Sequence, residues 1–172
     1  GISERAHARI LNLDLSDVRA APGVVTVLTV ADIPGENNHG PVLHDDPIFA
    51  EKIAEYAGQS LFAVVATSVD AARKAARLTR IEYEDLKPIG DVKTALERQS
   101  FVLPTRSLTR GKPAEAIRSA PHRLNGSLAV GGQEHFYLEG QIGVALPGED
   151  RTMLVYSSTQ HTSEVQRLVA HC

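Results

Sequence analysis

Residues 60–86 have the sequence SLFAVVATSVDAARKAARLTRIEYEDL, in which the spacing of apolar residues changes twice. The opening SLFAVVATS is apolar almost throughout, which is typical of a strand buried on both faces. Thr67 or Ser68 can then cap a helix over residues 69–80, whose alanines form a narrow stripe that packs close to a sheet. Residues 81–86 alternate apolar with acidic side chains, the period of a strand. A strand, a helix and a second strand predict a compact α+β unit.

The flanking stretches extend this unit. Residues 24–30 are rich in β-branched side chains and follow a short helical turn and a Pro-Gly break, which predicts another strand. Residues 36–49 are rich in Asn, Gly, Pro and Asp, and are expected to form a loop. Residues 91–98 are consistent with one more helix. We therefore expect a first domain over residues 1–98.

From residue 122 onward the pattern changes to long strands. Alternating side chains predict strands over 122–140, 141–148 and 151–160, with a Gly-Glu-Asp turn before the last. A helix is expected next, with Ser163 as its N-cap and Gln166 completing a capping box.

Residues 99–121 contain turn residues and one weak helical stretch, PAEAIRSA, and are expected to connect the two parts. The domains predicted are therefore 1–98, a connector over 99–121, and 122–172. The predicted fold class is α+β.

The composition excludes several classes of protein. Of 172 residues, 42% are hydrophobic and 23% are charged, and the formal net charge is −3, which is ordinary for a soluble globular protein. There is no block of Lys or Arg, so no nucleic-acid partner is expected. The single cysteine, Cys172, excludes an internal disulfide framework and a cysteine-based metal site, and it suits a reducing, cytoplasmic location. No apolar run approaches the roughly 18 residues of a membrane span.

Gln160 is the most distinctive polar residue, because it lies in SSTQHTSEVQ where a strand ends and a helix begins. Backbone N–H groups point outward at such a junction and bind anions or polarised oxygens, and a glutamine adds a neutral NH₂ donor. A surface turn accounts for the same residues.

The stretch GGQEHFYLEG, residues 131–140, holds a second group of candidates. Two glycines in a strand-like run indicate a bulge or a close approach by another group. Alternation places Gln133, His135 and Tyr137 on one face, either as a buried polar network or as the wall of a site. Glu134 and Glu139 would lie on opposite faces, so they are poor candidates for a catalytic pair. The histidines have no metal-binding spacing, and no metal site is predicted.

Long collinear stretches of this chain resemble the xanthine dehydrogenase and aldehyde oxidase family. The segments PGVVTVLTVADIPG, YAGQSLFAVVATS, AARKAA and IEYEDLKPI are similar to its hammerhead domain. The segments GGQEHFYLEGQ and YSSTQHTSEVQRLVAH resemble the start of its molybdopterin-binding domain, in particular that of bacterial members.

The resemblance implies several properties of this chain. Gln160 matches the glutamine whose amide hydrogen-bonds an oxo ligand on molybdenum, while Gln133, His135 and Glu139 match positions with a supporting role. The implied activity is purine hydroxylation of xanthine or hypoxanthine, with electrons passing through iron–sulfur clusters and FAD of a partner subunit or domain to NAD. No catalytic residue of the family falls within this chain. The family's glycine-rich segment, which helps to hold the cofactor, and its general-base glutamate are both absent from it. We therefore expect a piece of a longer subunit in an oligomeric enzyme.

Three alternatives remain open at this level. The enzyme could be a related molybdenum hydroxylase acting on aldehydes, carbon monoxide or a heteroaromatic acid. The chain could instead be a structural and assembly module that does no chemistry by itself. The third alternative is a small independent enzyme built around His135, Glu134 and Gln160.

Overall fold

The computed structural model describes residues 1–172 and divides them into two compact units, one of residues 1–88 with 141–172 and one of residues 89–140. None of the helices is both long and apolar enough to span a membrane. The helices and strands, with two short 3-10 helices labelled η, are in chain order β1 (Ala8–Asp14), α1 (Ser16–Ala20), β2 (Val24–Leu28), η1 (Val30–Asp32), β3 (Ile53–Ala54), β4 (Ala63–Ala66), α2 (Val69–Ala76), β5 (Arg80–Asp85), α3 (Val92–Glu97), α4 (Pro113–Ser119), β6 (Gly143–Pro147), η2 (Glu149–Arg151), β7 (Met153–Ser157) and α5 (Thr162–His171).

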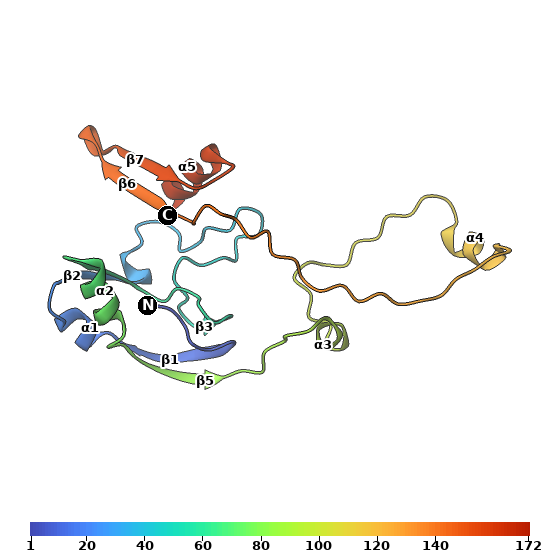
Figure 1. Ribbon diagram of the computed structural model, residues 1–172, viewed down its shortest axis with the longest axis horizontal. Coiled ribbons are helices and arrows are strands. Elements are labelled where there is room, and N and C mark those ends of the chain that lie inside the picture. The colour runs from blue at the N-terminus through green and yellow to red at the C-terminus, as the bar shows by residue number, and fades with distance from the viewer. The chain divides into compact units, whose positions relative to one another are not determined.

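All strand pairs in the molecule are antiparallel. β1 is the central strand of a three-stranded sheet in the order β3-β1-β5, and β2 pairs with β4 (Figure 1). β6 and β7 form a hairpin through the turn at η2. The register shifts at Leu11 in β1 and at Val25 in β2, and each of these apolar side chains is exposed, as expected for the extra residue of a β-bulge.

The core lies where the two short helices meet the β2-β4 pair. Figure 1 shows α1 and α2 beside β2, and α2 also packs against β4. Ala75 of α2 is only 1% exposed, because a small side chain lets the helix approach the strands closely. The buried apolar cluster consists of Leu15, Val18, Val27, Ala50, Leu61, Phe62 and Ala75.

The strand, helix and strand predicted over residues 60–86 are confirmed as β4, α2 and β5, and the α+β fold class is confirmed with them. Ser68 is the N-cap of α2, with its Oγ accepting a hydrogen bond of 3.1 Å from the Ala71 N–H. The prediction that the whole β4 stretch is buried on both faces is wrong. Phe62 is buried, but Val65 is 42% exposed, because α2 covers only one face of this two-stranded sheet.

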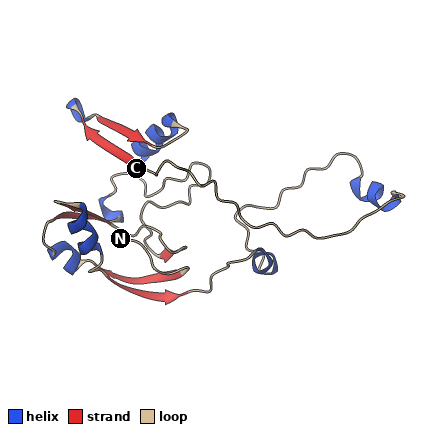
Figure 2. Cartoon of the chain, viewed as in Figure 1, coloured by secondary structure: helices blue, strands red, loops and turns tan.

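The strand predicted over residues 122–140 is absent. Figure 2 shows this stretch as loop, and no residue between 89 and 140 is buried. A strand needs a neighbouring strand to pair its backbone N–H and C=O groups, and none lies beside this stretch. Alternating side chains alone therefore did not produce a strand. The two helices expected in this part of the chain are present as α3 and α4.

The helix expected after Gln160 is present as α5, but it begins differently from the prediction. Its N-cap is His161, which makes no side-chain capping bond, and Ser163 lies inside the first turn. The capping box predicted for Ser163 and Gln166 is therefore wrong. The helix starts earlier because Thr159 Oγ already accepts a hydrogen bond of 3.0 Å from the His161 N–H and turns the chain there.

Candidate functional site

The polypeptide just before Gln160 is held by the β6-β7 hairpin. Beyond the last paired strand residues, the Ser158 N–H donates to the Ile142 carbonyl oxygen at 3.0 Å. The Ile142 N–H in turn donates to Ser158 Oγ at 3.1 Å. These hydrogen bonds continue the hairpin by one residue, so Gln160 lies two positions after a fixed point.

Gln160 itself lies in the short junction between β7 and α5. Its side chain is exposed and makes no hydrogen bond within the chain. The His161 side chain does not cap the first turn of α5, although the His161 carbonyl oxygen accepts from the Glu164 and Val165 N–H groups, each at 3.1 Å. The N–H groups that precede Glu164 in the helix have no intrahelical acceptor, as in the first turn of any α-helix. A neutral amide donor beside an uncapped helix N-terminus can bind an oxygen atom with negative or partial negative charge. This donor set is compatible with an oxygen-bearing cofactor.

The second group of candidates lies in the unit of residues 89–140. The rings of His135 and Tyr137 are stacked, with centroids 5.3 Å apart and planes 3° apart, so these side chains lie on the same side of the chain as alternation predicts. Between them, Phe136 has a φ of +54°, which is unfavourable for a bulky residue. The Phe136 N–H donates to Glu134 Oε1 at 3.2 Å, a local bond between a side chain and the backbone.

The predicted site residues are not gathered into one described site. Gln133, His135 and Glu139 are exposed and belong to the unit of residues 89–140, whereas Gln160 belongs to the other unit. A side chain added at Gly131 would meet no atom of this chain within 4 Å, so the chain itself does not supply the close approach that these glycines suggested. The supporting role of the three residues stays a prediction.

The charged side chains do not form a metal-binding site. No group of three or more His, Cys, Asp or Glu side chains is placed to hold a metal ion. Hydrogen bonds lower the pKa of three aspartates. Asp14 accepts from the side chain and backbone of Ser16, and Asp32 accepts from the backbone and side chain of Thr29. Asp91 accepts from the side chain and backbone of Thr94. All three carboxylates accept bonds from their own turn, a local structural role.

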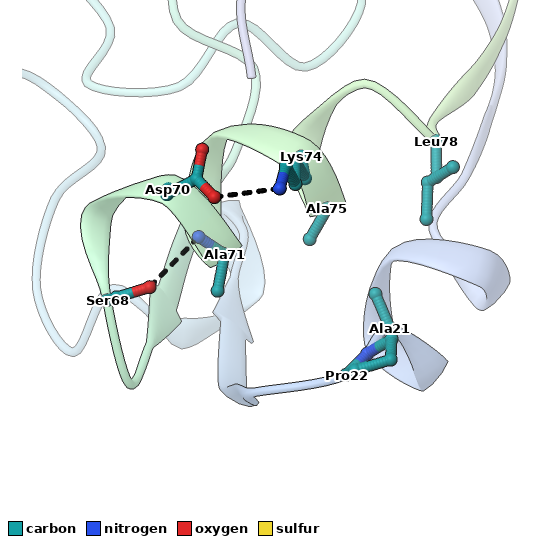
Figure 3. A pocket seen from close by; sticks show the side chains of 8 residues that line it. All are labelled: Ala21, Pro22, Ser68, Asp70, Ala71, Lys74, Ala75 and Leu78. Carbon is teal, nitrogen blue, oxygen red and sulfur yellow. Dashed lines mark hydrogen bonds and ion pairs between the residues drawn. The ribbon is translucent and has the colours of Figure 1, made fainter.

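Two pockets in the first 88 residues contain none of the predicted site residues. The first, of about 370 Å³, lies between the end of α1 and one face of α2 (Figure 3). Its floor is apolar, and its polar groups are already paired, Ser68 with the Ala71 N–H and Asp70 with Lys74 at 2.8 Å. The second, of about 610 Å³, is lined in part by three arginines and Tyr83, whose buried hydroxyl has no partner.

Family models match nearly the whole chain in two parts. Residues 1–87 match the aldehyde oxidase and xanthine dehydrogenase a/b hammerhead domain. Residues 94–172 match the molybdopterin cofactor-binding domain, and Gln160, Gln133, His135 and Glu139 all lie in this second part.

Curated relatives and solved structures agree with this match. The chain is 38% identical over 169 residues to the xanthine dehydrogenase/oxidase of Gallus gallus, covering 98% of this chain and 12% of that protein. It is 39% identical over 170 residues to aldehyde oxidase 4 of Cavia porcellus, again covering 98% of this chain and 12% of that protein. The structure of quinoline 2-oxidoreductase from Pseudomonas putida 86 superposes with a TM-score of 0.77 at 26% identity, over 99% of this chain and 24% of that chain. The chain thus spans about an eighth of the length of these curated relatives.

Proposed function

We propose that this chain, which belongs to the aldehyde oxidase and xanthine dehydrogenase family, is part of the molybdopterin-binding subunit of a molybdenum hydroxylase that oxidises xanthine or hypoxanthine. The family models that match residues 1–87 and 94–172 support the first part of this proposal. The observation that carries the role of this chain is the free amide of Gln160 at an uncapped helix N-terminus.

The proposal of a purine substrate is based on the amino-acid sequence of two motifs. GGQEHFYLEGQ and YSSTQHTSEVQRLVAH resemble bacterial xanthine dehydrogenases. Identity alone does not separate the substrates, since the chain is 41% identical to the xanthine dehydrogenase of Calliphora vicina and 39% identical to an aldehyde oxidase. A related hydroxylase acting on aldehydes, carbon monoxide or a heteroaromatic acid is the alternative within the family.

Gln160 is the residue of this chain that would hold the cofactor. When bound, the molybdenum cofactor supplies the oxidation chemistry, and the protein supplies orientation and electrostatics. The Gln160 NH₂ would donate a hydrogen bond to an oxygen of that cofactor, and a glutamine amide brings no titrating proton to this position. Gln133, His135 and Glu139 would have the supporting role that the family resemblance implies for them.

The remaining partners follow from the same proposal. The rest of the molybdenum subunit would supply the general base and the substrate pocket. Iron–sulfur clusters and FAD on a partner subunit or domain would pass the electrons on to NAD. The enzyme is an oligomer in the cytoplasm. We also propose that the first domain ends at residue 98 and that a connector over residues 99–121 joins it to the second.

The test is replacement of Gln160 by Ala in the complete holoenzyme, with Gln166→Ala as the control, because Gln166 is also exposed but lies on α5 beyond the junction. Loss of a preorganised donor to the reacting centre is expected to lower kcat by about a hundredfold or more. Molybdenum content and thermal stability should stay at the level of the unsubstituted enzyme. Unchanged kinetics with full molybdenum content would contradict the role of Gln160.

A specific observation supports a second function for the 172 residues by themselves. None of residues 89–140 is buried, and Gln160 has no partner within the chain, so the isolated chain contains no assembled site. It would then act as a structural and assembly module. Metal analysis of the purified chain separates the two possibilities, because stoichiometric molybdenum would exclude a purely structural role.

A further inference from the structure

The hairpin of β6 and β7 ends at the pair of Ile142 and Ser158, just before the chain leads into α5 (Figure 1). In a regular antiparallel ladder, a hydrogen-bonded pair of residues exchanges two N–H···O=C bonds. The Ser158 N–H makes the first of these, to the Ile142 carbonyl oxygen at 3.0 Å. The Ile142 N–H donates instead to Ser158 Oγ at 3.1 Å, and this hydroxyl also donates to the Ile142 carbonyl oxygen at 3.3 Å. A side chain thus replaces a backbone acceptor, and the ladder ends at Ser158.

The Thr159 hydroxyl holds the turn that follows. Thr159 Oγ1 accepts a hydrogen bond of 3.0 Å from the His161 N–H, so the bond spans Gln160. A hydroxyl bonded to the backbone N–H two residues further on restricts the backbone of the residue between them. His161 is also the N-cap of α5, so this turn leads directly into the helix. The backbone of Gln160 is therefore held on both sides.

These hydrogen bonds are specific to the two residues that directly precede Gln160. All of them join residues between 142 and 161, within one compact unit. By contrast, the hydroxyl of Ser157, one position earlier, makes no hydrogen bond within the chain. The place of the Gln160 amide depends on where the backbone of Gln160 is fixed. For a group that takes part in a reaction, a displacement of about 1 Å costs up to about a hundredfold in rate.

We propose that Ser158 and Thr159 are positioning residues for the Gln160 amide. The Ser158 hydroxyl fixes the point at which the chain leaves the hairpin, and the Thr159 hydroxyl fixes the direction that the chain takes through Gln160. Both act through the donor that Gln160 presents, and neither needs to contact the cofactor. The inference rests on the proposed function, because it takes the Gln160 amide as the group that contacts the cofactor.

The first test measures the hydrogen bonds themselves by hydrogen exchange in the complete holoenzyme. Ser158→Ala removes the acceptor of the Ile142 N–H, and Thr159→Val removes the acceptor of the His161 N–H. The peptide that contains the affected amide should exchange that proton about tenfold faster. Ser157→Ala is the matched control, because it deletes a neighbouring hydroxyl that makes no hydrogen bond. Exchange as slow in Ser158→Ala and Thr159→Val as in this control would overturn the proposal.

The second test separates positioning from general stability by steady-state kinetics. Ser158→Ala and Thr159→Val are each expected to lower kcat by about tenfold, with KM and molybdenum content unchanged, because the donor is displaced but not removed. Thr159→Ser keeps the hydroxyl and should restore kcat, and Ser157→Ala should not lower it. No loss in Ser158→Ala and Thr159→Val, or a Thr159→Ser enzyme as slow as Thr159→Val, would contradict the positioning role.

The third test asks whether Ser158 acts through Gln160. In the Gln160→Ala background, Ser158→Ala is expected to cause no further loss of kcat, because the donor that it positions is already gone. A further loss of about tenfold in that background would show that Ser158 affects the reaction by another route, and would overturn the inference.

The two proposals fail in distinguishable ways. If Gln160→Ala leaves kcat unchanged with full molybdenum content, the proposed role of Gln160 is refuted, and the hydrogen bonds seen by exchange have only a structural role. If Gln160→Ala lowers kcat while Ser158→Ala and Thr159→Val do not, the role of Gln160 stands and only the positioning inference is refuted.

Discussion

Gly23 shows how a single residue determines the entry into the core. Its φ is +81°, and the Val24 N–H donates to the Ala21 carbonyl oxygen at 3.2 Å, so Ala21, Pro22, Gly23 and Val24 form a tight turn from α1 into β2. A Cβ at Gly23 would also lie 2.8 Å from Thr67 Oγ. Proline fixes the first turn position and glycine alone adopts the second without strain.

Replacement of Gly23 by Ala is therefore expected to lower the free energy of unfolding by about 1–2 kcal/mol, the cost of a left-handed conformation for an L-residue. Gly90→Ala is the control, since Gly90 is unhindered and has no positive φ, and its effect should stay within about 0.5 kcal/mol. Chemical denaturation followed by circular dichroism measures both. A Gly23→Ala protein as stable as the control would show that the turn is not strained by a side chain.

Asp91 makes a prediction about pH. Hydrogen bonds from the Thr94 hydroxyl and then from the Thr94 N–H hold the pKa of Asp91 below its ordinary value. Because the folded pKa is the lower one, the stabilisation is complete above the ordinary pKa and is lost as pH falls through the folded pKa. Thr94→Val removes the larger cause, so the pKa of Asp91 should rise toward the ordinary value in an NMR titration. The pKa of Asp14 serves as the internal reference and should not move.

Among the elements, α2 owes its start to one side chain. Ser68 Oγ accepts the Ala71 N–H at 3.1 Å, and the helix continues for only eight residues, so the cap stabilises a large share of it. Ser68→Ala is expected to cost about 1 kcal/mol of stability. Ser107, an exposed loop residue outside any helix or strand, provides the control variant Ser107→Ala. Identical melting temperatures for the two variants would contradict the capping role.

The same elements show what the sequence could and could not predict. The β4-α2-β5 stretch was predictable because the spacing of apolar residues in each element repeats often enough to be recognised. The Ser68 cap was predictable because it involves only neighbouring residues. β1 was missed, since the bulge at Leu11 exposes an apolar residue and breaks the alternation, and β3 has only two residues. Residues 122–140 alternate, but a strand depends on a partner that the pattern does not contain.

The candidate site was predictable only in part, for a related reason. The strand end and helix start around Gln160 follow from local patterns, and the structure has both. The interaction assigned to its amide came from family resemblance, because the group it would bind lies outside this chain.

At the scale of the whole molecule, exposed apolar surface is the dominant feature. In the hairpin, Val144 lies opposite Tyr156 and Leu146 lies opposite Leu154, so these four side chains share one face, and they are 46–58% exposed. More apolar side chains are exposed along residues 121–140, which have no buried residue. Exposed apolar side chains that share one face, as these four of the hairpin do, are characteristic of interfaces.

The isolated chain is therefore expected to associate with itself in solution, through this hairpin face and the exposed stretch. Light scattering over a range of concentrations should give a mass above that of one chain. Leu154→Lys should weaken the association by placing a charge in the centre of the apolar face. A clean monomer at high concentration would contradict the expectation.

The most direct test of the role assigned to Gln160 is a crystal structure of the complete subunit with its molybdenum cofactor bound. The account predicts that Gln160 Nε2 lies within about 3.2 Å of an oxygen ligand of the metal, the range of a good N–H···O hydrogen bond. A Gln160 side chain pointing into solvent, away from the cofactor, would contradict it.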